Sequence, residues 1–240
     1  MPEIPARPPR PAAVPGASTA DFLATVPLFT AMERGELVRF AELTREKTYP
    51  KGSVIVFEDD PGDSLFVVRD GRVKVVLVAE DGREVILGVL GIGEHFGELS
   101  LIDDQPRSAH VIAMEDATLL VLRREDFRRR VESSPSVAWA LLIELSRRLR
   151  QADGKIGGLV LLDVPGRIAR LLLDFATGDN GTVIEKPLTH QTIANMIGAS
   201  RETVSRTMRE FQDLNWVRVE RRRISLADAA ALRKRAQVRV

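Results

Sequence analysis

Residues 188–216 read LTHQTIANMIGASRETVSRTMREFQDLNW and predict two short helices joined by a tight turn. Thr189 and Ser200 each precede a segment of apolar residues at helical spacing, where a side-chain hydroxyl can accept from the first backbone N–H groups of a helix. Between the two segments Gly198 supplies the turn, because glycine adopts a left-handed backbone without steric cost. The pattern is typical of a helix-turn-helix, whose second helix enters the major groove of DNA.

The second of these helices carries side chains that suit base recognition. Arginine offers two parallel donors to guanine O6 and N7, and glutamate accepts from cytosine N4. At 100° per residue, five polar residues fall within an arc of about 140°: Arg201, Glu202, Ser205, Arg206 and Arg209. An ordinary amphipathic hairpin explains the apolar face of Val204, Met208 and Phe211 but not this arc. WVRVE and RRRISL, around residue 221, add a predicted two-stranded wing with basic residues.

The distribution of charge agrees with a polyanion partner for the second part of the chain. Residues 163–240 hold 14 Lys and Arg against 9 Asp and Glu, whereas the remaining 162 residues hold 21 against 25. The chain as a whole has a net charge of +1, so the asymmetry is hidden in the total. One basic half is the pattern expected when that half meets nucleic acid.

The middle of the chain predicts β-structure. Short β-branched or alternating runs are separated by turn signals such as Asp-Gly, which indicates a hairpin. The predicted strands are SVIVF (53–57), SLFVV (64–68), RVKVVLV (72–78), REVILGVL (83–90), HVIAM (110–114) and TLLVL (118–122). Their spacing favours an antiparallel roll or sandwich. Before them, residues 19–44 have helical spacing, with breaks at Pro27 and near Gly35, and residues 1–18, with six prolines, are expected to form a flexible tail.

A long helix is predicted to begin at Ser134-Pro135, with serine as the N-cap and proline in the first turn. Inside it apolar residues recur in steps of 4 and 3: Ala138, Leu142, Leu145, Leu149, Ala152, Ile156 and Leu159. Such a heptad seam favours pairing with the same helix of a second copy over packing on the chain's own core. Asp163-Val164-Pro165-Gly166 is expected to end the helix and act as a hinge. We therefore expect segments at 1–18, 19–134, 135–162 and 163–240.

Composition argues against several classes of protein. The absence of cysteine excludes disulfides, thiolate metal sites and a cysteine nucleophile. The three histidines, His95, His110 and His190, are far apart in sequence, so we expect no metal and no catalytic residues, and a cupin-like enzyme is disfavoured. No apolar run approaches ~18 residues and no export signal begins the chain, which predicts a cytoplasmic protein without a membrane span.

One further stretch, HFGELSLIDDQPRSAHV (95–111), completes a set of motifs. GEL…RSA, the seam helix, LLDVPGRIA and GASRETVSR together resemble the CRP/FNR family of bacterial transcription regulators, most closely its cyclic-AMP-binding members. The resemblance covers about residues 20–226. It implies an α+β fold: an N-terminal double-stranded β-helix, jelly-roll-like, that binds a cyclic nucleotide, a long dimerisation helix, and a C-terminal winged helix-turn-helix.

The resemblance implies a role for each residue of a phosphate-binding cassette. Gly97 and its neighbour Leu99 offer backbone N–H groups to a cyclic phosphate, Glu98 accepts from the ribose 2′-hydroxyl, and Arg107 and Ser108 bind the phosphate. Arg148 and Asp153, on the long helix, complete the expected ligand-binding set, with cyclic AMP as the allosteric ligand.

The base-binding positions depart from the family. Ala152 and Asp153 stand where cyclic-AMP-binding members carry a Thr-Ser pair. This leaves open cyclic GMP, another effector or none. A different class, a nucleotide-binding module that acts on a protein partner, is disfavoured by the helix-turn-helix.

For the DNA-binding half, the resemblance implies base contacts and phosphate contacts. The base-reading residues are Arg201, Glu202 and Arg206, and the phosphate-contacting residues are Thr189, Gln191, Ser200 and Thr203. Retention of Arg-Glu-Thr-Val-x-Arg implies TGTGA-like half-sites in a palindrome. The expected partners are double-stranded DNA, a second copy through Leu142, Leu145, Leu149, Ala152, Ile156 and Leu159, and RNA polymerase.

Overall fold

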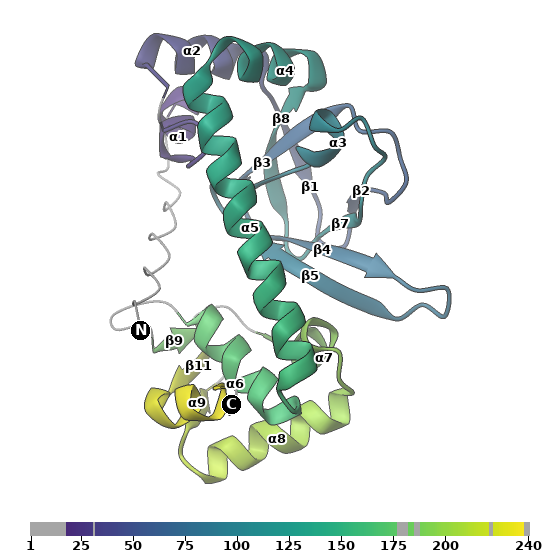
Figure 1. Cartoon of the computed structure of the whole chain (residues 1–240), viewed down its shortest axis with the longest axis vertical. Coiled ribbons are helices and arrows are strands. Elements are labelled where there is room, and N and C mark those ends of the chain that lie inside the picture. Colours follow the sequence, from purple (N-terminus) through teal and green to yellow (C-terminus); the bar gives the residue numbers. More distant parts are fainter. Residues whose placement is uncertain (1–17, 31, 177–181, 185–187, 221–222, 238–240) are drawn as a thin grey trace. The chain divides into compact units, whose positions relative to one another are not determined.

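The computed structural model describes residues 18–30, 32–176, 182–184, 188–220 and 223–237 (Figure 1). The chain forms two compact units, one of residues 1–83 and 87–147 and the other of residues 84–86 and 148–240. Helix α5 (Pro135–Leu161) contributes residues to both. Except for Ser18, the predicted tail lies outside the described residues.

The β-roll consists of two four-stranded sheets. The first has the order β1 (Arg45–Tyr49), β8 (Ala117–Arg123), β3 (Ser64–Asp70) and β6 (His95–Phe96). The second has the order β2 (Val54–Val56), β7 (His110–Ala113), β4 (Val73–Val78) and β5 (Glu84–Leu90). Neighbours such as β3 and β8 pair in antiparallel register. All six strands expected from the sequence are present, and the predicted antiparallel roll is confirmed.

Strand β3 separates the two cores of the first unit. Its side chains alternate between faces, as in any strand. Phe66 and Val68 face the interior of the roll with residues of both sheets, whereas Leu65 and Val67 join the core under the helices. Both faces are therefore covered, and β3 reads in the sequence as a continuous apolar run.

Besides the first turns of α5, the described part of the first unit has the helices α1 (Thr19–Thr25), α2 (Arg34–Leu43), α3 (Leu99–Ile102) and α4 (Arg124–Ser133). The helical region before the strands is confirmed, and it is interrupted between Thr25 and Arg34, at Pro27 and up to the residue before Gly35. Gly35 is the second residue of α2, because Glu33 and Glu36 form a capping box that starts the helix just before it. A glycine so close to a helix start costs little helix stability.

The second unit builds a winged helix-turn-helix on its own core. Its helices are α6 (Val164–Phe175), α7 (His190–Ile197), α8 (Arg201–Asp213) and α9 (Ala229–Arg235). β10 (Val217–Glu220) and β11 (Arg223–Leu226) form the expected wing, and β9 (Val183–Ile184) pairs with β11. The sequence predicted two strands here, and the structure adds a third, β9. A strand of two residues is too short to show an alternating pattern in the sequence.

The segment after α5 ends one helix and begins another. Asp163 Oδ1 accepts from Gly166 N at 3.0 Å and so caps α6, and its other oxygen pairs with Arg235 of α9. Within α5, a Cβ on Gly154 would come within 2.9 Å of Arg170 Nη2. Because Arg170 Nη2 is the end of a flexible side chain, this approach does not by itself require glycine at position 154.

Two turn glycines allow a matched test of crowding in the roll. Gly71 and Gly82 have φ values of +78° and +80°, but only a Cβ on Gly71 would collide, at 2.4 Å from the Asp116 carbonyl oxygen. We expect Gly82→Ala to cost about 1 kcal/mol of unfolding free energy through backbone strain. Gly71→Ala should cost a further ~1–3 kcal/mol through overpacking. Urea denaturation of both variants measures the difference, and equal losses would contradict the crowding at Gly71.

Candidate functional site

A sharp turn positions the expected cassette between β6 and α3. Gly97 has φ +87°, and a Cβ there would lie 2.6 Å from Arg107 Nη1 and 2.9 Å from the Ser64 carbonyl oxygen. Both the backbone conformation and the close approach require glycine. The turn brings the Gly97 carbonyl group and the first residues of α3 against the side chain of Arg107.

Arg107 is the buried cation of this turn, with 5% of its surface exposed. Its Nη1 donates to the Gly97 carbonyl oxygen at 2.7 Å and to Ser100 Oγ at 2.9 Å, and its Nη2 donates to the Ser64 carbonyl oxygen at 2.7 Å. Burial lowers the pKa of Arg107, while the carboxylate of Asp63, 3.9 Å away, acts in the opposite direction. The guanidinium is thus surrounded by protein acceptors.

The other expected cassette residues lie on the same segment of the first unit. Glu98 is buried and its carboxylate contributes to the electrostatic environment of Arg107. Its backbone carbonyl oxygen accepts from Leu101 N at 3.0 Å, which starts the single turn of α3. Leu99 and Ser108 are exposed. The structure therefore brings together Gly97, Glu98, Leu99, Arg107 and Ser108.

Two arginines that sequence reasoning missed hold this cassette from α4. Arg124 Nη2 donates to the Ser100 carbonyl oxygen at 3.0 Å, and Arg124 also pairs with Asp104. Arg128 Nη2 donates to Asp104 Oδ2 at 2.7 Å, and its Nε donates to a carbonyl oxygen of α3 at 2.7 Å. These arginines hold the pKa of Asp104 below its ordinary value. Their spacing of four residues places both on one helix face, but nothing in the sequence names the partner.

The expected base-binding residues belong to the second unit. Arg148 is half-buried, and Ala152 and Asp153 are exposed on the part of α5 that begins at residue 148. The cassette belongs to the first unit, so a joint role with Arg148 and Asp153 in one ligand site stays a prediction.

The heptad seam remains largely on the surface of α5. Leu142, Leu149, Ile156 and Leu159 are each more than half exposed. Ala152 is exposed as well, and Leu145 is half-buried beside the helical core of the first unit. This chain's own core does not absorb the seam, which leaves an apolar stripe available to another molecule.

The helix-turn-helix has the caps and the turn that the sequence predicts. Thr189 Oγ1 accepts from Thr192 N at 3.0 Å, and Ser200 Oγ accepts from Thr203 N at 3.1 Å. Gly198, between the two helices, has φ +62°. The predicted apolar faces are buried: Ile193, Ala194, Ile197, Val204, Met208 and Phe211.

The expected DNA-contacting side chains gather around the start of α8. Arg201, Glu202 and Arg206 are exposed, and none of these three charges is needed to complete the core. The expected phosphate contacts are also at the surface: Thr189, Gln191 and Ser200 are exposed and Thr203 is half-buried. The arrangement presents Arg and Glu from the first turns of a supported helix, the geometry that base readout requires.

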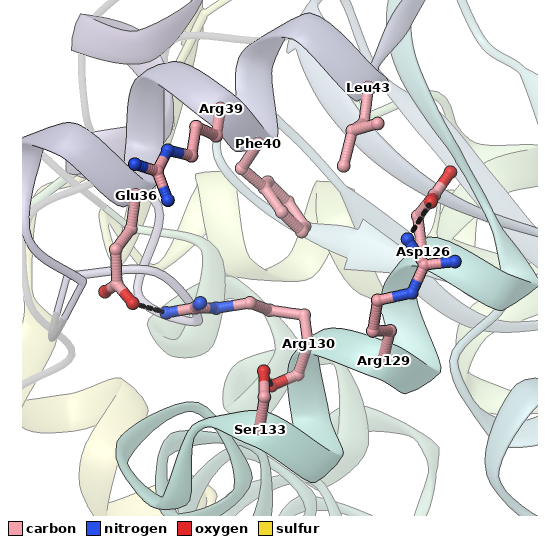
Figure 2. Close-up of a pocket in the computed structure, with 8 residues that line it drawn as sticks. All are labelled: Glu36, Arg39, Phe40, Leu43, Asp126, Arg129, Arg130 and Ser133. Atoms are coloured by element: carbon pink, nitrogen blue, oxygen red, sulfur yellow. Dashed lines mark hydrogen bonds and ion pairs between the residues drawn. The ribbon is translucent and has the colours of Figure 1, made fainter.

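A hollow of about 170 Å³ lies between α2 and α4, and Figure 2 draws residues that line it. Arg130 pairs with Glu36 across it, and Arg129 Nη1 lies 3.7 Å from Asp126 Oδ1. The charged side chains that line the hollow thus form ion pairs with one another.

Among the described residues no group of three or more His, Asp or Glu side chains is placed to hold a metal ion. No helix of the described ranges has the length and apolarity of a membrane span.

Comparison with known proteins identifies two domains. Residues 46–134 match the family model of the cyclic nucleotide-binding domain, and residues 166–235 match that of the Crp-like helix-turn-helix domain. A CRP-like cAMP-activated global transcriptional regulator of Mycobacterium tuberculosis is 32% identical, over 90% of this chain and 99% of that protein. The cyclic AMP receptor protein of Thermus thermophilus is 34% identical, over 86% and 94%.

A solved structure shows the same architecture. The c-di-GMP responsive global regulator CLP of Xanthomonas campestris superposes with a TM-score of 0.68 and 25% identity, over 81% of this chain and 99% of that one. The matching models and relatives describe ligand-binding, DNA-binding regulators, and none of them indicates a catalytic family.

The geometry of Arg107 predicts that its side chain stabilises the fold. Arg107→Ala removes the donor from two backbone carbonyl oxygens and Ser100 Oγ, so we expect a loss of about 2–5 kcal/mol in unfolding free energy. Arg123→Ala, which truncates an exposed arginine in β8, should change it by less than about 0.5 kcal/mol. Chemical denaturation without any ligand measures both. Similar stabilities for the two variants would mean that the carbonyl groups find other donors.

Proposed function

This chain belongs to the CRP/FNR family of transcription regulators, and we propose that it is a cytoplasmic homodimer whose DNA binding is controlled by cyclic AMP. It has the cyclic nucleotide-binding domain and the helix-turn-helix DNA-binding domain of such regulators. The observation that carries the proposal is the turn at Gly97, which lies against the buried side chain of Arg107 and is followed by the buried Glu98.

The chemistry of the cassette suits a cyclic nucleotide. A 3′,5′-cyclic phosphate carries one negative charge, which one guanidinium can neutralise, and the free 2′-hydroxyl can donate to one carboxylate. Arg107 would exchange neutral acceptors for phosphate oxygens, since hydrogen bonds between charged groups are about twice as strong as neutral ones. Ser108, exposed next to it, adds a hydroxyl donor. Backbone N–H groups at Gly97 and Leu99 would complete the phosphate contacts.

Cyclic AMP is the effector that the comparisons favour. The relatives from M. tuberculosis and T. thermophilus are both named for cyclic AMP. The Xanthomonas regulator with the same fold responds to c-di-GMP instead, so the fold alone does not select the ligand. Asp153, with Arg148 on the same helix, would lie near the base. An ionised carboxylate only accepts, and guanine offers it two donors from N1 and N2 whereas adenine offers only its amino group. Cyclic GMP is therefore the alternative effector, and regulation without an effector is the second.

The DNA-binding proposal assigns roles along α7 and α8. Arg201, Glu202 and Arg206 would read base edges in TGTGA-like half-sites, while four hydroxyl or amide side chains would contact phosphates: Thr189, Gln191, Ser200 and Thr203. Phosphate contacts fix the register of a protein on DNA, and base contacts give its sequence preference. RNA polymerase is the expected protein partner of the bound regulator.

The dimer would form through the exposed seam of α5. Two copies of a heptad stripe can bury each other's Leu142, Leu149, Ile156 and Leu159 in a coiled coil, with Leu145 and Ala152 between them. A dimer also presents two recognition helices, and helix-turn-helix dimers bind half-sites about one helical turn, ~34 Å, apart. A dimer formed through the seam of α5 would therefore present the two recognition helices that a palindromic DNA site requires.

We expect calorimetric titration to show binding of cyclic AMP by the wild-type chain. Ser108→Ala should weaken it about fivefold, which corresponds to one hydrogen bond of ~1 kcal/mol. Asp103→Ala, at an exposed carboxylate of the neighbouring turn, serves as the control and should leave affinity unchanged. Asp153→Ala should alter the ratio of the affinities for cyclic AMP and cyclic GMP. If neither nucleotide binds the wild type, the effector assignment fails.

On DNA, Arg201→Ala should cost about 1–3 kcal/mol on a TGTGA palindrome and relax the preference at one base pair. Arg233→Ala, an exposed arginine of α9, should leave that preference intact. Fluorescence anisotropy with palindromic and random duplexes at two salt concentrations separates base readout from phosphate attraction. An equal loss on both duplexes would remove Arg201 from base recognition.

A further inference from the structure

The cassette is joined along its backbone to a turn of residues 57–60, which directly follows β2. Arg107 N donates to the Asp60 carbonyl oxygen at 2.9 Å, and the Arg107 carbonyl oxygen accepts from Asp59 N at 2.9 Å. Asp59 has φ +65°, a left-handed conformation that aspartate adopts more readily than most other residues. The turn therefore holds the main chain of Arg107, whereas the carbonyl groups of Gly97 and Ser64 hold its side chain.

A third hydrogen bond attaches the turn to this segment, and its acceptor is a side chain. Glu58 N donates to Nδ1 of His110 at 3.1 Å. His110 is the first residue of β7 and comes three residues after Arg107. The ring of Phe57 meets the imidazole edge-on, with centroids 6.1 Å apart and planes at 86°. Two consecutive residues of the turn thus contact the His110 ring, and its side chain is 25% exposed.

The bond from Glu58 N determines which nitrogen of His110 carries the proton. A backbone N–H can only donate, so Nδ1 must accept, and the single proton of the neutral ring lies on Nε2. Nε2 is 3.6 Å from Glu58 Oε2. A second proton would occupy Nδ1 and leave Glu58 N without this acceptor, because both ring nitrogens then donate. The imidazolium would at the same time attract the Glu58 carboxylate. Protonation therefore exchanges a bond to the backbone of the turn for an ion pair with its side chain.

The charged residues around His110 come from the turn, the cassette and β4. In the pairing of β4 with β7, Val76 is opposite His110 and Lys74 is opposite Ile112, so Lys74 lies on the same face of the sheet as His110. The full set is Glu58, Asp59, Asp60, Lys74 and Arg107. Histidine is the side chain that ordinarily changes its charge between about pH 5 and 8. A pH dependence of the cassette in that range would therefore report His110 rather than these neighbours.

We propose that His110 is a positioning residue for the effector site, and that its neutral form holds the turn of residues 57–60 against Arg107. The proposal rests on the assignment of the cassette as the cyclic nucleotide site. Protonation of His110 releases Glu58 N, and the adjacent bonds of Asp59 and Asp60 to Arg107 lose the support of that bond. Affinity for the nucleotide is therefore complete above the range in which His110 titrates and is lost as the pH falls through it.

Calorimetric titration of the full chain with cyclic AMP at about pH 7.5 and about pH 5.5 measures the effect. We expect the wild type to bind about fivefold more weakly at the lower pH, the equivalent of one hydrogen bond. His110→Asn keeps an acceptor, Oδ1, in the position of Nδ1 but takes up no proton, so its affinity should be the same at both pH values. Glu58→Gln removes the charge partner of the imidazolium, so the loss of affinity should begin at a lower pH. His190→Gln, in the second unit, is the control and should follow the wild type.

Amide NMR of the chain without ligand tests the hydrogen bond itself. The signals of Glu58 and Arg107 should move together with pH in the wild type and stay constant in His110→Asn. A Glu58 signal that does not respond to pH refutes the proposal, even where the nucleotide binds. A loss of affinity that persists in His110→Asn assigns the pH dependence to another group, such as His95 of β6, and also overturns it. If the two signals move together but cyclic AMP binds at neither pH, the effector assignment fails and the coupling of His110 to Arg107 stands.

Discussion

The backbone of the cassette is arranged around one buried guanidinium group, that of Arg107. Arg107 has lost its water and keeps its charge, so every donor must meet an acceptor inside the protein. Two backbone carbonyl oxygens and a serine hydroxyl accept from three of its five N–H groups, and the chain must come very close to do so. This requires glycine at two places. A Cβ on Gly97 would collide with Arg107, and one on Gly62 would lie 2.1 Å from Ser100 Oγ.

The same segment is tied to the helices through its outer side. Arg124 and Arg128 of α4 hold carbonyl groups of α3 and the carboxylate of Asp104. Only Ser134 separates the end of α4 from the start of α5. Phe127 of α4 and Val137 of α5 enter one core with Leu101 of α3. The cassette, α4 and the beginning of α5 therefore form one packed assembly. Of the four arginines among the ten residues of α4, two, Arg124 and Arg128, hold the cassette.

The sequence could predict those elements whose residues carry a local signal. The helices α7 and α8 were predictable because Thr189, Gly198 and Ser200 act within a few residues of where they stand. By contrast, β1 was missed because its residues REKTY are charged or exposed and show no alternation, and its pairing with β8 comes from distant parts of the chain. In the site, the motif residues from Gly97 to Ser108 were predicted through the family, and they do gather. Arg124 and Asp104 were not, since an ion pair between segments 20 residues apart leaves no pattern in either.

Burial divides the functional residues into two kinds. Arg201, Glu202 and Arg206 are exposed, so their chemistry can change without a cost to the core of the second unit. Arg107 is part of the fold, and a ligand that uses it must first displace neutral acceptors from it. Because the guanidinium is already out of water, the desolvation cost of the cation has been met during folding, and what remains is the cost of dehydrating the ligand's phosphate. A phosphate with one charge and two free oxygens could take the place of two of the three acceptors that Arg107 now has. Acceptors with no charge could fill the same positions but would gain nothing over the protein's own groups, so a ligand that binds Arg107 would have to be an anion.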